Sequence, residues 1–192
     1  NFIFGGSHLL DVYYNIRNKK IRNLIKKISQ RNNYIGAHLS YDSYKDNQMI
    51  NKELNNYKLF LKSNNIKQNN LTTRMHYLKW KSPETLVYLD KAGANLDTSL
   101  GYSGSPGFRC GTCHVYTGYD PINHKILDIK VFPLILMDVT LTNNINLNLE
   151  DAYDVAIDLK NKCKKVNGKF TLLWHNCNLT NDDKKALFKS LI

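Results

Sequence analysis

Strand-like and helix-like segments alternate along this 192-residue chain. The helix-like segments carry apolar residues at every third or fourth position, and the strand-like segments are short apolar runs. The expected helices span 11–31, 45–63, 82–92 and 150–165. The expected strands span 2–5, 34–40, 71–77 and 169–175. This alternation predicts an α/β fold with a mostly parallel sheet or barrel, and the length predicts a single domain over residues 1–192.

The central and last parts of the chain continue the alternation. Apolar runs predict further strands at 95–100, 108–116, 126–132 and 134–141, and the last amphipathic stretch predicts a helix at 182–191. Pro83 lies at the expected start of the helix at 82–92, and Gly93 lies just after its expected end.

The formal net charge of +11 raises the possibility of a nucleic-acid partner. However, Lys and Asn are spread over the whole chain. In the densest basic stretch, residues 17–27, the charges alternate with Ile21, Leu24 and Ile25 at helical spacing. This spacing predicts the solvated face of an amphipathic helix. The weaker alternative is a nucleic-acid binder that stacks bases on tyrosines, namely Tyr13, Tyr14, Tyr41, Tyr44 and Tyr57.

Four cysteines in a chain of this length do not indicate a disulfide framework. Cys110 and Cys113 form a CxxC motif, but a strand-like run follows it and the chain has no second pair, so neither redox chemistry nor structural zinc is favoured.

The sequence has no run of eighteen apolar residues and no signal peptide at its start. We therefore expect a reduced, cytoplasmic compartment without a transmembrane segment. Because residue 1 is not Met and opens an apolar run, we expect the true N-terminus to lie upstream.

Four segments place a His or Arg beside an expected strand. They contain His38, the pair Arg74 and His76, Arg109, and His175. The carboxyl ends of parallel strands meet at one edge of a sheet or barrel, where active sites lie. The sequence therefore predicts that these side chains form one site.

The chemistry of these side chains leaves alternatives open. His38 and Asp42 are four residues apart and could face one metal ion if the segment turns, although a structural histidine is the simpler interpretation. Strand alternation sends Arg74 and His76 to the same side, where Arg74 could orient a carboxylate and His76 could bind metal or move a proton.

The two remaining segments are equally open to more than one interpretation. Arg109 could clamp a carboxylate or hold loop carbonyls, and His175 at the end of an apolar strand could be a general acid or base. Asp97 and Asp138 also lie at strand ends, and either could orient such a histidine or cap a turn.

The order of these motifs resembles the polysaccharide deacetylase family (NodB-homology carbohydrate esterases), in a divergent bacterial branch. Ile35-Gly-Ala-His38 resembles the GxH metal motif of that family, and Thr73-Arg-Met-His-Tyr77 resembles its Arg-x-Pro-Tyr motif with His76 where Pro is usual. Leu172-Leu-Trp-His175 resembles the terminal Leu-x-x-His motif. The segments at 92–99, 107–113 and 133–141 are also similar, so that the resemblance covers about residues 2–178.

The resemblance implies a distorted (β/α)7 barrel and a divalent metal ion, usually zinc, that activates a water to remove acetyl from an N-acetylated sugar or polysaccharide. His38 is then a metal ligand, His175 the general acid, and Arg74 the residue that orients the catalytic base. The second metal ligand is His76 or Asp42, and His76 is favoured because neutral imidazole is the more usual zinc ligand. The residues expected at the substrate are Tyr77, Arg109 and Asp97.

One part of the family pattern is missing from the sequence. The family carries an Asp-Asp or His-Asp pair on its first strand, whereas this chain begins on what should be the second strand. We therefore expect a barrel that lacks its first strand and a chain that is poorly active or inactive by itself. The alternative function is a non-catalytic carbohydrate-binding or scaffold protein in a surface-polysaccharide pathway.

Overall fold

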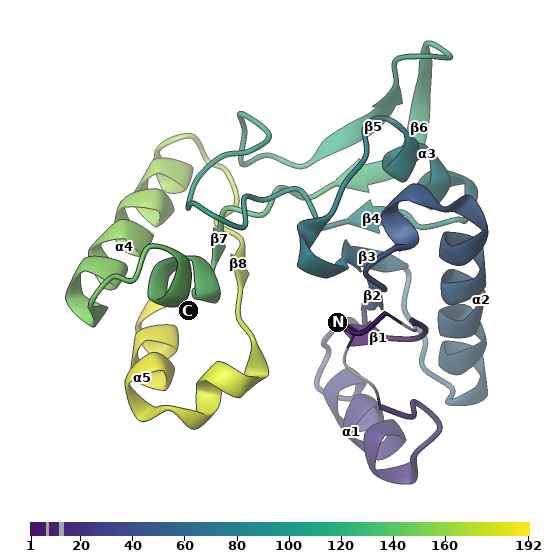
Figure 1. Cartoon of the computed structure of the whole chain (residues 1–192), viewed down its shortest axis with the longest axis horizontal. Helices are drawn as coiled ribbons and strands as arrows, with labels where there is room; N and C mark the ends of the chain where they lie inside the picture. Colours follow the sequence, from purple (N-terminus) through teal and green to yellow (C-terminus); the bar gives the residue numbers. More distant parts are fainter. Residues whose placement is uncertain (7, 12–13) are drawn as a thin grey trace. The chain divides into compact units, whose positions relative to one another are not determined.

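The computed structural model describes residues 1–6, 8–11 and 14–192 (Figure 1). The chain forms two compact units. Unit 1 comprises Asn1–Ser99 with Tyr116–Val131, and unit 2 comprises Leu100–Val115 with Phe132–Ile192. Helices and a mostly parallel sheet make up the structure, which confirms the predicted α/β class.

Unit 1 contains a six-stranded sheet in the order β1-β2-β3-β4-β6-β5. The strands are β1 (Phe2–Ile3), β2 (Ala37–Leu39), β3 (Thr72–Met75), β4 (Leu96–Asp97), β5 (Tyr116–Asp120) and β6 (Lys125–Val131). Every neighbouring pair from β1 to β6 is parallel, and only β5 runs antiparallel to β6 in a hairpin. The carboxyl ends of β1, β2 and β3 therefore lie at one edge of the sheet.

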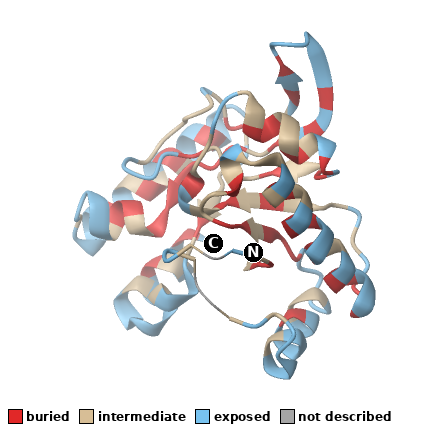
Figure 2. Ribbon diagram, turned by 45° about the vertical axis from the view of Figure 1, so that its right-hand side comes forward, coloured by how far each residue is buried: buried red, intermediate tan, exposed pale blue. Residues whose placement is uncertain are grey.

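The described part of unit 1 contains three α-helices: α1 (Lys19–Ser29), α2 (Asn47–Ser63) and α3 (Glu84–Lys91). Helix α2 begins where the Asp46 carboxylate accepts hydrogen bonds from two backbone N–H groups of the first turn, and it buries Ile50, Leu54 and Tyr57 completely or nearly so. Figure 2 shows helices with buried residues on one side and exposed residues on the other. Helix α3 ends just before Gly93, whose φ of 78° suits a glycine after a helix, as the sequence predicts.

Helix α1 is shorter than predicted. It begins at Lys19, where the Asn18 side chain accepts a hydrogen bond from the backbone N–H of Lys20. Asp11, the expected N-terminal residue of this helix, instead accepts a hydrogen bond from the backbone N–H of Tyr41 at 2.9 Å. Part of the predicted range, residues 12 and 13, lies outside the described residues.

Unit 2 contains the parallel strands β7 (Leu136–Met137) and β8 (Leu172–Leu173) and the helices α4 (Leu149–Lys165) and α5 (Asp182–Leu191). Both helices agree closely with the predicted ranges. The strand predicted at 134–141 is shorter, because the chain turns into a π-helix at Thr140–Asn144. A core from α4, α5 and the strands includes Ile135, Leu136, Ala152, Ala156 and Leu187.

The strand predicted at 108–116 is wrong except at Tyr116, which opens β5. The segment before it is a loop, in which Gly107 and Gly111 have positive φ values of 134° and 65°. Left-handed backbone at these positions interrupts an extended strand. Across the described part of the chain, no helix combines the length and apolar character needed to cross a membrane.

Candidate functional site

The parallel register of β1, β2 and β3 sets the position of the candidate site in unit 1. Ile3 lies opposite His38, and His38 lies opposite Arg74 in the sheet. His76 follows the last residue of β3 and opens a short 3-10 turn, His76–Leu78. The rings of His38 and His76 consequently lie side by side, with their centroids 5.0 Å apart.

His38 is fixed by a hydrogen bond between its Nδ1 and the carbonyl oxygen of Arg74, at 2.9 Å. A carbonyl can only accept, so Nδ1 carries the proton and Nε2 keeps its lone pair. Burial, together with smaller effects of the nearby His76 and Arg74, lowers the pKa of His38 to about 3 although the hydrogen bond opposes this shift. The ring is therefore a neutral imidazole with Nε2 as a base, the form in which histidine binds metal ions.

His76 is fixed by Asp11. The distance between His76 Nδ1 and Asp11 Oδ1 is 2.7 Å, and the Asp11 side chain is only 5% exposed. Asp11 also accepts hydrogen bonds from the backbone N–H groups of Tyr41 and His8, at 2.9 and 3.3 Å. A carboxylate on Nδ1 orients the ring and makes Nε2 a stronger ligand, an arrangement common behind metal-binding histidines.

The sequence does not reveal the role of Asp11, because this residue fits the start of a helix. The resemblance also led us to expect the first carboxylate of the site outside the chain. In the structure a carboxylate does follow the edge strand β1 and contacts one of the two histidines. The only signal for it in the sequence is that His8 and Asp11 follow an apolar run, as the other candidate residues do.

Asp42, the alternative metal ligand, lies on the turn after β2. Its carboxylate is 3.6 Å from Lys45 Nζ in an exposed ion pair, whereas Asp11 is the carboxylate that contacts His76. Within residues 1–6, 8–11 and 14–192, no three His, Cys, Asp or Glu side chains are grouped so that they could hold a metal ion. The structure therefore brings together two of the three expected ligands, His38 and His76.

An aromatic cluster adjoins the two histidines. Tyr77 is 57% exposed, and its ring centroid lies 4.8 Å from that of His76 and 5.5 Å from that of Tyr41. Tyr41 itself is stacked on His8 at 4.3 Å, and Lys79 Nζ lies 3.7 Å from the Tyr41 ring centroid. Tyr77 is therefore the ring of this cluster that is most open to solvent.

The backbone of Tyr77 and Leu78 is left-handed, with φ values of 56° and 54°. Bulky residues rarely adopt this conformation, and it costs roughly 1–2 kcal/mol per residue. Such strain is concentrated at functional sites. Here it ends β3 abruptly and turns Tyr77 into contact with the His76 ring.

Arg74 and Asp97 belong to a polar network inside the sheet. Arg74 Nε donates to the Thr98 carbonyl at 3.2 Å, and burial lowers the pKa of Arg74 to about 10 although Asp97 opposes this effect. The carboxylate of Asp97 is fully buried and accepts hydrogen bonds from Thr73 Oγ1 and from the N–H and Oγ of Ser99. Burial raises the pKa of Asp97 against these hydrogen bonds. Asp97 is therefore held inside the sheet by Thr73 and Ser99.

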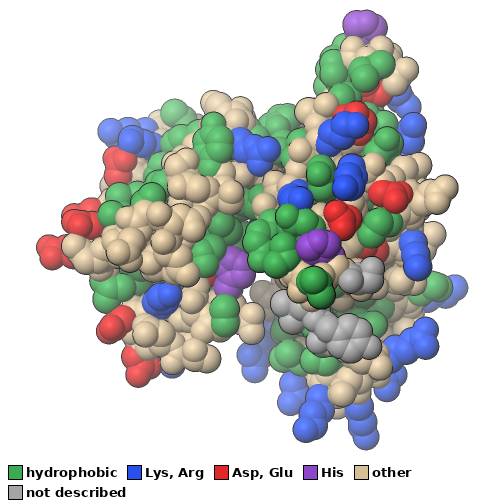
Figure 3. Space-filling model, in the orientation of Figure 1, with side chains coloured by type: hydrophobic (Ala, Val, Ile, Leu, Met, Phe, Trp, Pro, Cys, Tyr) green, Lys and Arg blue, Asp and Glu red, His purple; other side chains and the backbone are tan. Residues whose placement is uncertain are grey.

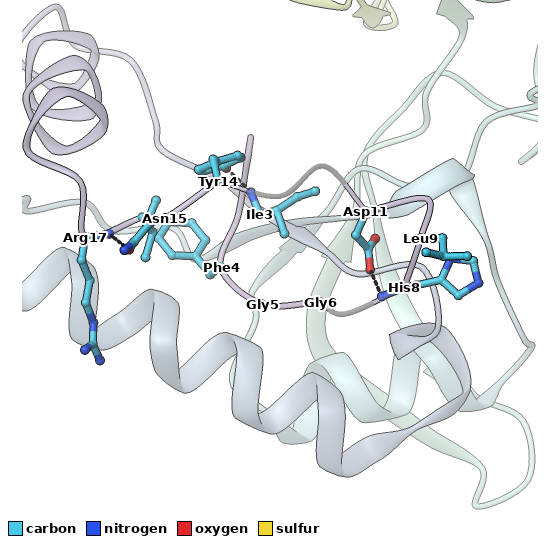
Figure 4. Close-up of a pocket in the computed structure, with 11 residues that line it drawn as sticks. Ile3, Phe4, Gly5, Gly6, His8, Leu9, Asp11, Tyr14, Asn15 and Arg17 are labelled. Atoms are coloured by element: carbon cyan, nitrogen blue, oxygen red, sulfur yellow. Dashed lines mark hydrogen bonds between the residues drawn. The ribbon is translucent and has the colours of Figure 1, made fainter.

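A cavity of about 570 Å³ lies beside Asp11, between β1 and the segment that follows it (Figure 4). His8 and Asp11 lie at one end of this cavity, and Tyr14, Asn15 and Arg17 lie at the other. Tyr14 accepts a hydrogen bond from the Ile3 N–H at 2.6 Å. The cavity therefore brings open space to the carboxylate that supports His76.

Unit 2 carries a separate pair, Asp138 and His175, at the carboxyl ends of β7 and β8. His175 Nδ1 lies 2.6 Å from Asp138 Oδ1, and the His175 N–H donates to Asp138 Oδ2 at 2.7 Å. The side chain of Asn178 and the backbone of Val139 also donate to this carboxylate. Asp138 has no exposed side-chain surface, whereas the His175 side chain is 43% exposed.

The electrostatics of this pair suit proton transfer. Burial alone would raise the pKa of Asp138, but its hydrogen bonds with His175 and Asn178 outweigh that effect and lower it. The ionised carboxylate holds the proton of His175 on Nδ1 and leaves Nε2 to exchange protons with a bound molecule. Of the two aspartates that the sequence offered as partners, Asp138 is the one that orients His175.

Arg109 and the CxxC motif lie in the loop of unit 2. Arg109 donates from Nη1 to the Gly101 carbonyl at 3.0 Å, which is the structural role that the sequence left open beside substrate binding. Cys110 Sγ lies 3.7 Å from the Leu100 carbonyl oxygen, whereas Cys113 is buried and forms a hydrogen bond with the thiol of Cys163. The two cysteines of the motif therefore have different surroundings.

The tyrosines proposed for base stacking do not form one surface. Tyr57 is fully buried, with its hydroxyl donating to the Ile35 carbonyl, and Tyr41 is covered by His8 and Lys79. Tyr13 lies outside the described residues.

No family model, no curated protein and no solved structure matches this chain.

Proposed function

We propose that this chain is a metal-dependent deacetylase-like hydrolase that removes acetyl from an N-acetylated sugar or polysaccharide, as its resemblance to the polysaccharide deacetylase family implies. The distorted (β/α)7 barrel without its first strand is part of this proposal. The observation that carries it is the pair His38 and His76, whose Nδ1 atoms are both held by acceptors. Each ring therefore presents a basic Nε2 atom, and the ring centroids lie 5.0 Å apart.

His38 and His76 would hold the metal ion, which we take to be zinc because imidazole nitrogen is a preferred zinc ligand. When bound, zinc would polarise the acetyl carbonyl and lower the pKa of a water molecule. Asp11 would keep His76 oriented, and Arg74 would hold His38 through its carbonyl oxygen.

The chain's own residues would supply part of the remaining chemistry, because the resemblance places the catalytic base on the first strand of the family. Water gives a proton to that base and adds to the acetyl carbonyl carbon, the C–N bond breaks, and acetate leaves while the sugar nitrogen takes up a proton. The resemblance to the family implies that His175 donates that proton; within its own unit, Asp138 fixes the Nδ1 atom of His175 and leaves Nε2 for proton exchange. Tyr77 would stack on the sugar ring.

Zinc binding tests this proposal most directly. We expect zinc to compete with a chromophoric chelator for the wild-type chain, and we expect His38→Ala and His76→Ala to abolish that competition. The exposed histidine variant His114→Ala is the matched control and should bind like the wild type. Unchanged zinc binding in both site variants would overturn the proposal.

Acetate release from an N-acetylated chitooligosaccharide is the second measurement. The chain alone is expected to release acetate slowly or not at all, and a longer chain with an upstream strand that carries an Asp pair is expected to be faster. Equal rates for the two chains would show that the sequence-based expectation of a missing carboxylate is wrong.

A non-catalytic carbohydrate-binding protein is the second candidate. The observation that favours it is the lack, within the described residues, of a third ligand grouped with the two histidines. Sugar binding without zinc binding, also in the longer chain, would establish this candidate in place of the hydrolase.

A further inference from the structure

The positive charge of the chain is concentrated around α1. Between Asp11 and Asp42 the sequence has seven Lys or Arg and no Asp or Glu, out of a net charge of +11 for the whole chain. Those on α1 are all exposed: Lys19, Lys20, Arg22, Lys26 and Lys27. Figure 3 shows Lys and Arg side chains gathered over this end of unit 1.

The helix also exposes a leucine among these cations. Ile25 is fully buried and forms the inner side of α1, whereas Leu24 is 48% exposed. Lys20 lies four residues before Leu24 and Lys27 three residues after it, so all three share one face of the helix. An apolar side chain between two lysines can enter an apolar layer while the long lysine side chains reach back to charged groups.

A separate groove of about 470 Å³ lies between α1 and α2, and its lining includes Arg17, Arg22 and Leu59. Arg22 lies two residues from both Lys20 and Leu24, so it points away from the face that carries them. We name Lys20, Leu24 and Lys27 the α1 surface.

We propose that the α1 surface docks on the anionic face of a lipid bilayer. Exposed cations with an exposed apolar side chain among them and no acidic residue suit the headgroup region, where each Lys or Arg near the surface contributes about 1 kcal/mol. The exposed Leu24 favours lipid over a soluble polyanion, because it would leave water in the bilayer but would gain nothing from a charged polymer. The inference goes beyond the proposed function and does not depend on it.

Vesicle co-sedimentation tests the inference. The chain is expected to bind vesicles of phosphatidylcholine mixed with phosphatidylglycerol and not vesicles of phosphatidylcholine alone. The double variant Lys20→Gln/Lys27→Gln should weaken binding about thirtyfold, since about 1 kcal/mol per lysine corresponds to roughly fivefold. Leu24→Ser should weaken it about fivefold, because it removes the half-exposed apolar side chain.

The matched control is Lys164→Gln/Lys165→Gln, which removes the same charge from exposed positions at the end of α4. It should bind the mixed vesicles within about twofold of the wild type, because salt screens charges that do not touch the bilayer. Equal losses in the two double variants would overturn the inference, as would equal binding to both kinds of vesicle. Unchanged binding by Leu24→Ser, together with displacement by inorganic polyphosphate, would show a soluble polyanion site instead. Zinc binding is expected to be the same in all these variants, so failure here is distinct from failure of the proposed hydrolase.

Discussion

Replacement of Asp138 by Asn tests whether this carboxylate organises the carboxyl ends of β7 and β8. Asn has the same shape but lacks the charge, and its NH2 group must take the place of one carboxylate oxygen. Each oxygen of Asp138 accepts two hydrogen bonds: Oδ1 from His175 Nδ1 and the Val139 N–H, and Oδ2 from the His175 N–H and Asn178 Nδ2. Either orientation of the amide therefore loses two hydrogen bonds.

The structure sets the size of the expected loss. Hydrogen bonds to a charged group contribute about 1.5–3 kcal/mol each, and the partly exposed His175 places this case at the low end, so the variant should lose about 3 kcal/mol at pH 7. With an m value of about 2 kcal/mol/M, the urea midpoint should fall by about 1.5 M.

The loss should depend on pH in a defined direction. In the folded chain the pKa of Asp138 is below its ordinary value. The contribution of this carboxylate to the free energy of unfolding is therefore complete above the unfolded pKa of about 4, and it disappears as the pH falls through the folded pKa. Urea unfolding of the wild type and the variant can be followed by circular dichroism between neutral pH and about pH 3. The difference between their free energies of unfolding should shrink as the pH falls.

Asp97→Asn is the matched control, because Asp97 is also fully buried at the end of a strand. Two of its three donors are the hydroxyls of Thr73 and Ser99, which can rotate to accept from an amide, so this variant should lose less than about 1 kcal/mol. The pKa of Asp97 is raised, so this variant should gain stability relative to wild type as the pH rises. Equal losses for the two substitutions at neutral pH, or a loss for Asp138→Asn that persists in acid, would refute the reasoning.

Three further predictions concern the site in unit 1 and the cysteines. Asp11→Asn should weaken zinc binding at least about tenfold in a chelator competition, because it removes the carboxylate behind His76, whereas Asp42→Asn should leave the affinity unchanged. Tyr77→Gly should stabilise the chain against urea by about 1 kcal/mol, because glycine adopts left-handed backbone without strain. The same variant should bind sugar more weakly in calorimetry, and a loss of stability would contradict the inference that the backbone at Tyr77 is strained. Ellman's reagent should modify exposed Cys177 first and Cys163 last, since burial raises the pKa of the Cys163 thiol to about 11; fast reaction of Cys163 in the folded chain would show that it is accessible.

Much of the fold follows from hydrophobic periodicity in the sequence. The helices α2 and α4 and the strand β6 lie close to their predicted ranges, because their inner residues repeat at the spacing of the element they form. The segment 108–116 has similar apolar content, but Gly107 and Gly111 take left-handed backbone there. Whether a glycine does so depends on the surrounding structure, so the local pattern predicted a strand wrongly.

The candidate site was predictable in part for a similar reason. His38 and His76 meet because parallel strands bring their carboxyl ends to one edge, and the positions of β2 and β3 along the chain follow from the apolar runs in the sequence. Asp11 could not be assigned, because it contacts His76 across 65 residues and no local periodicity records such a contact. His175 had two candidate aspartates at strand ends, and only the pairing of β7 with β8 decides between them.

Two neighbouring strands of the unit 1 sheet are far apart in the order of synthesis. Strand β4 pairs with β6, and Leu96 lies opposite Lys130, which is synthesised 34 residues after it. At a synthesis rate of about 5–20 residues per second, β4 is completed roughly 2–7 s before the residues of β6 that pair with it. During that interval β4, which carries Asp97, is an open sheet edge on the nascent chain and a template for pairing with other strands. The order of synthesis, rather than the finished sheet, therefore sets the period in which this chain is most exposed to misassembly.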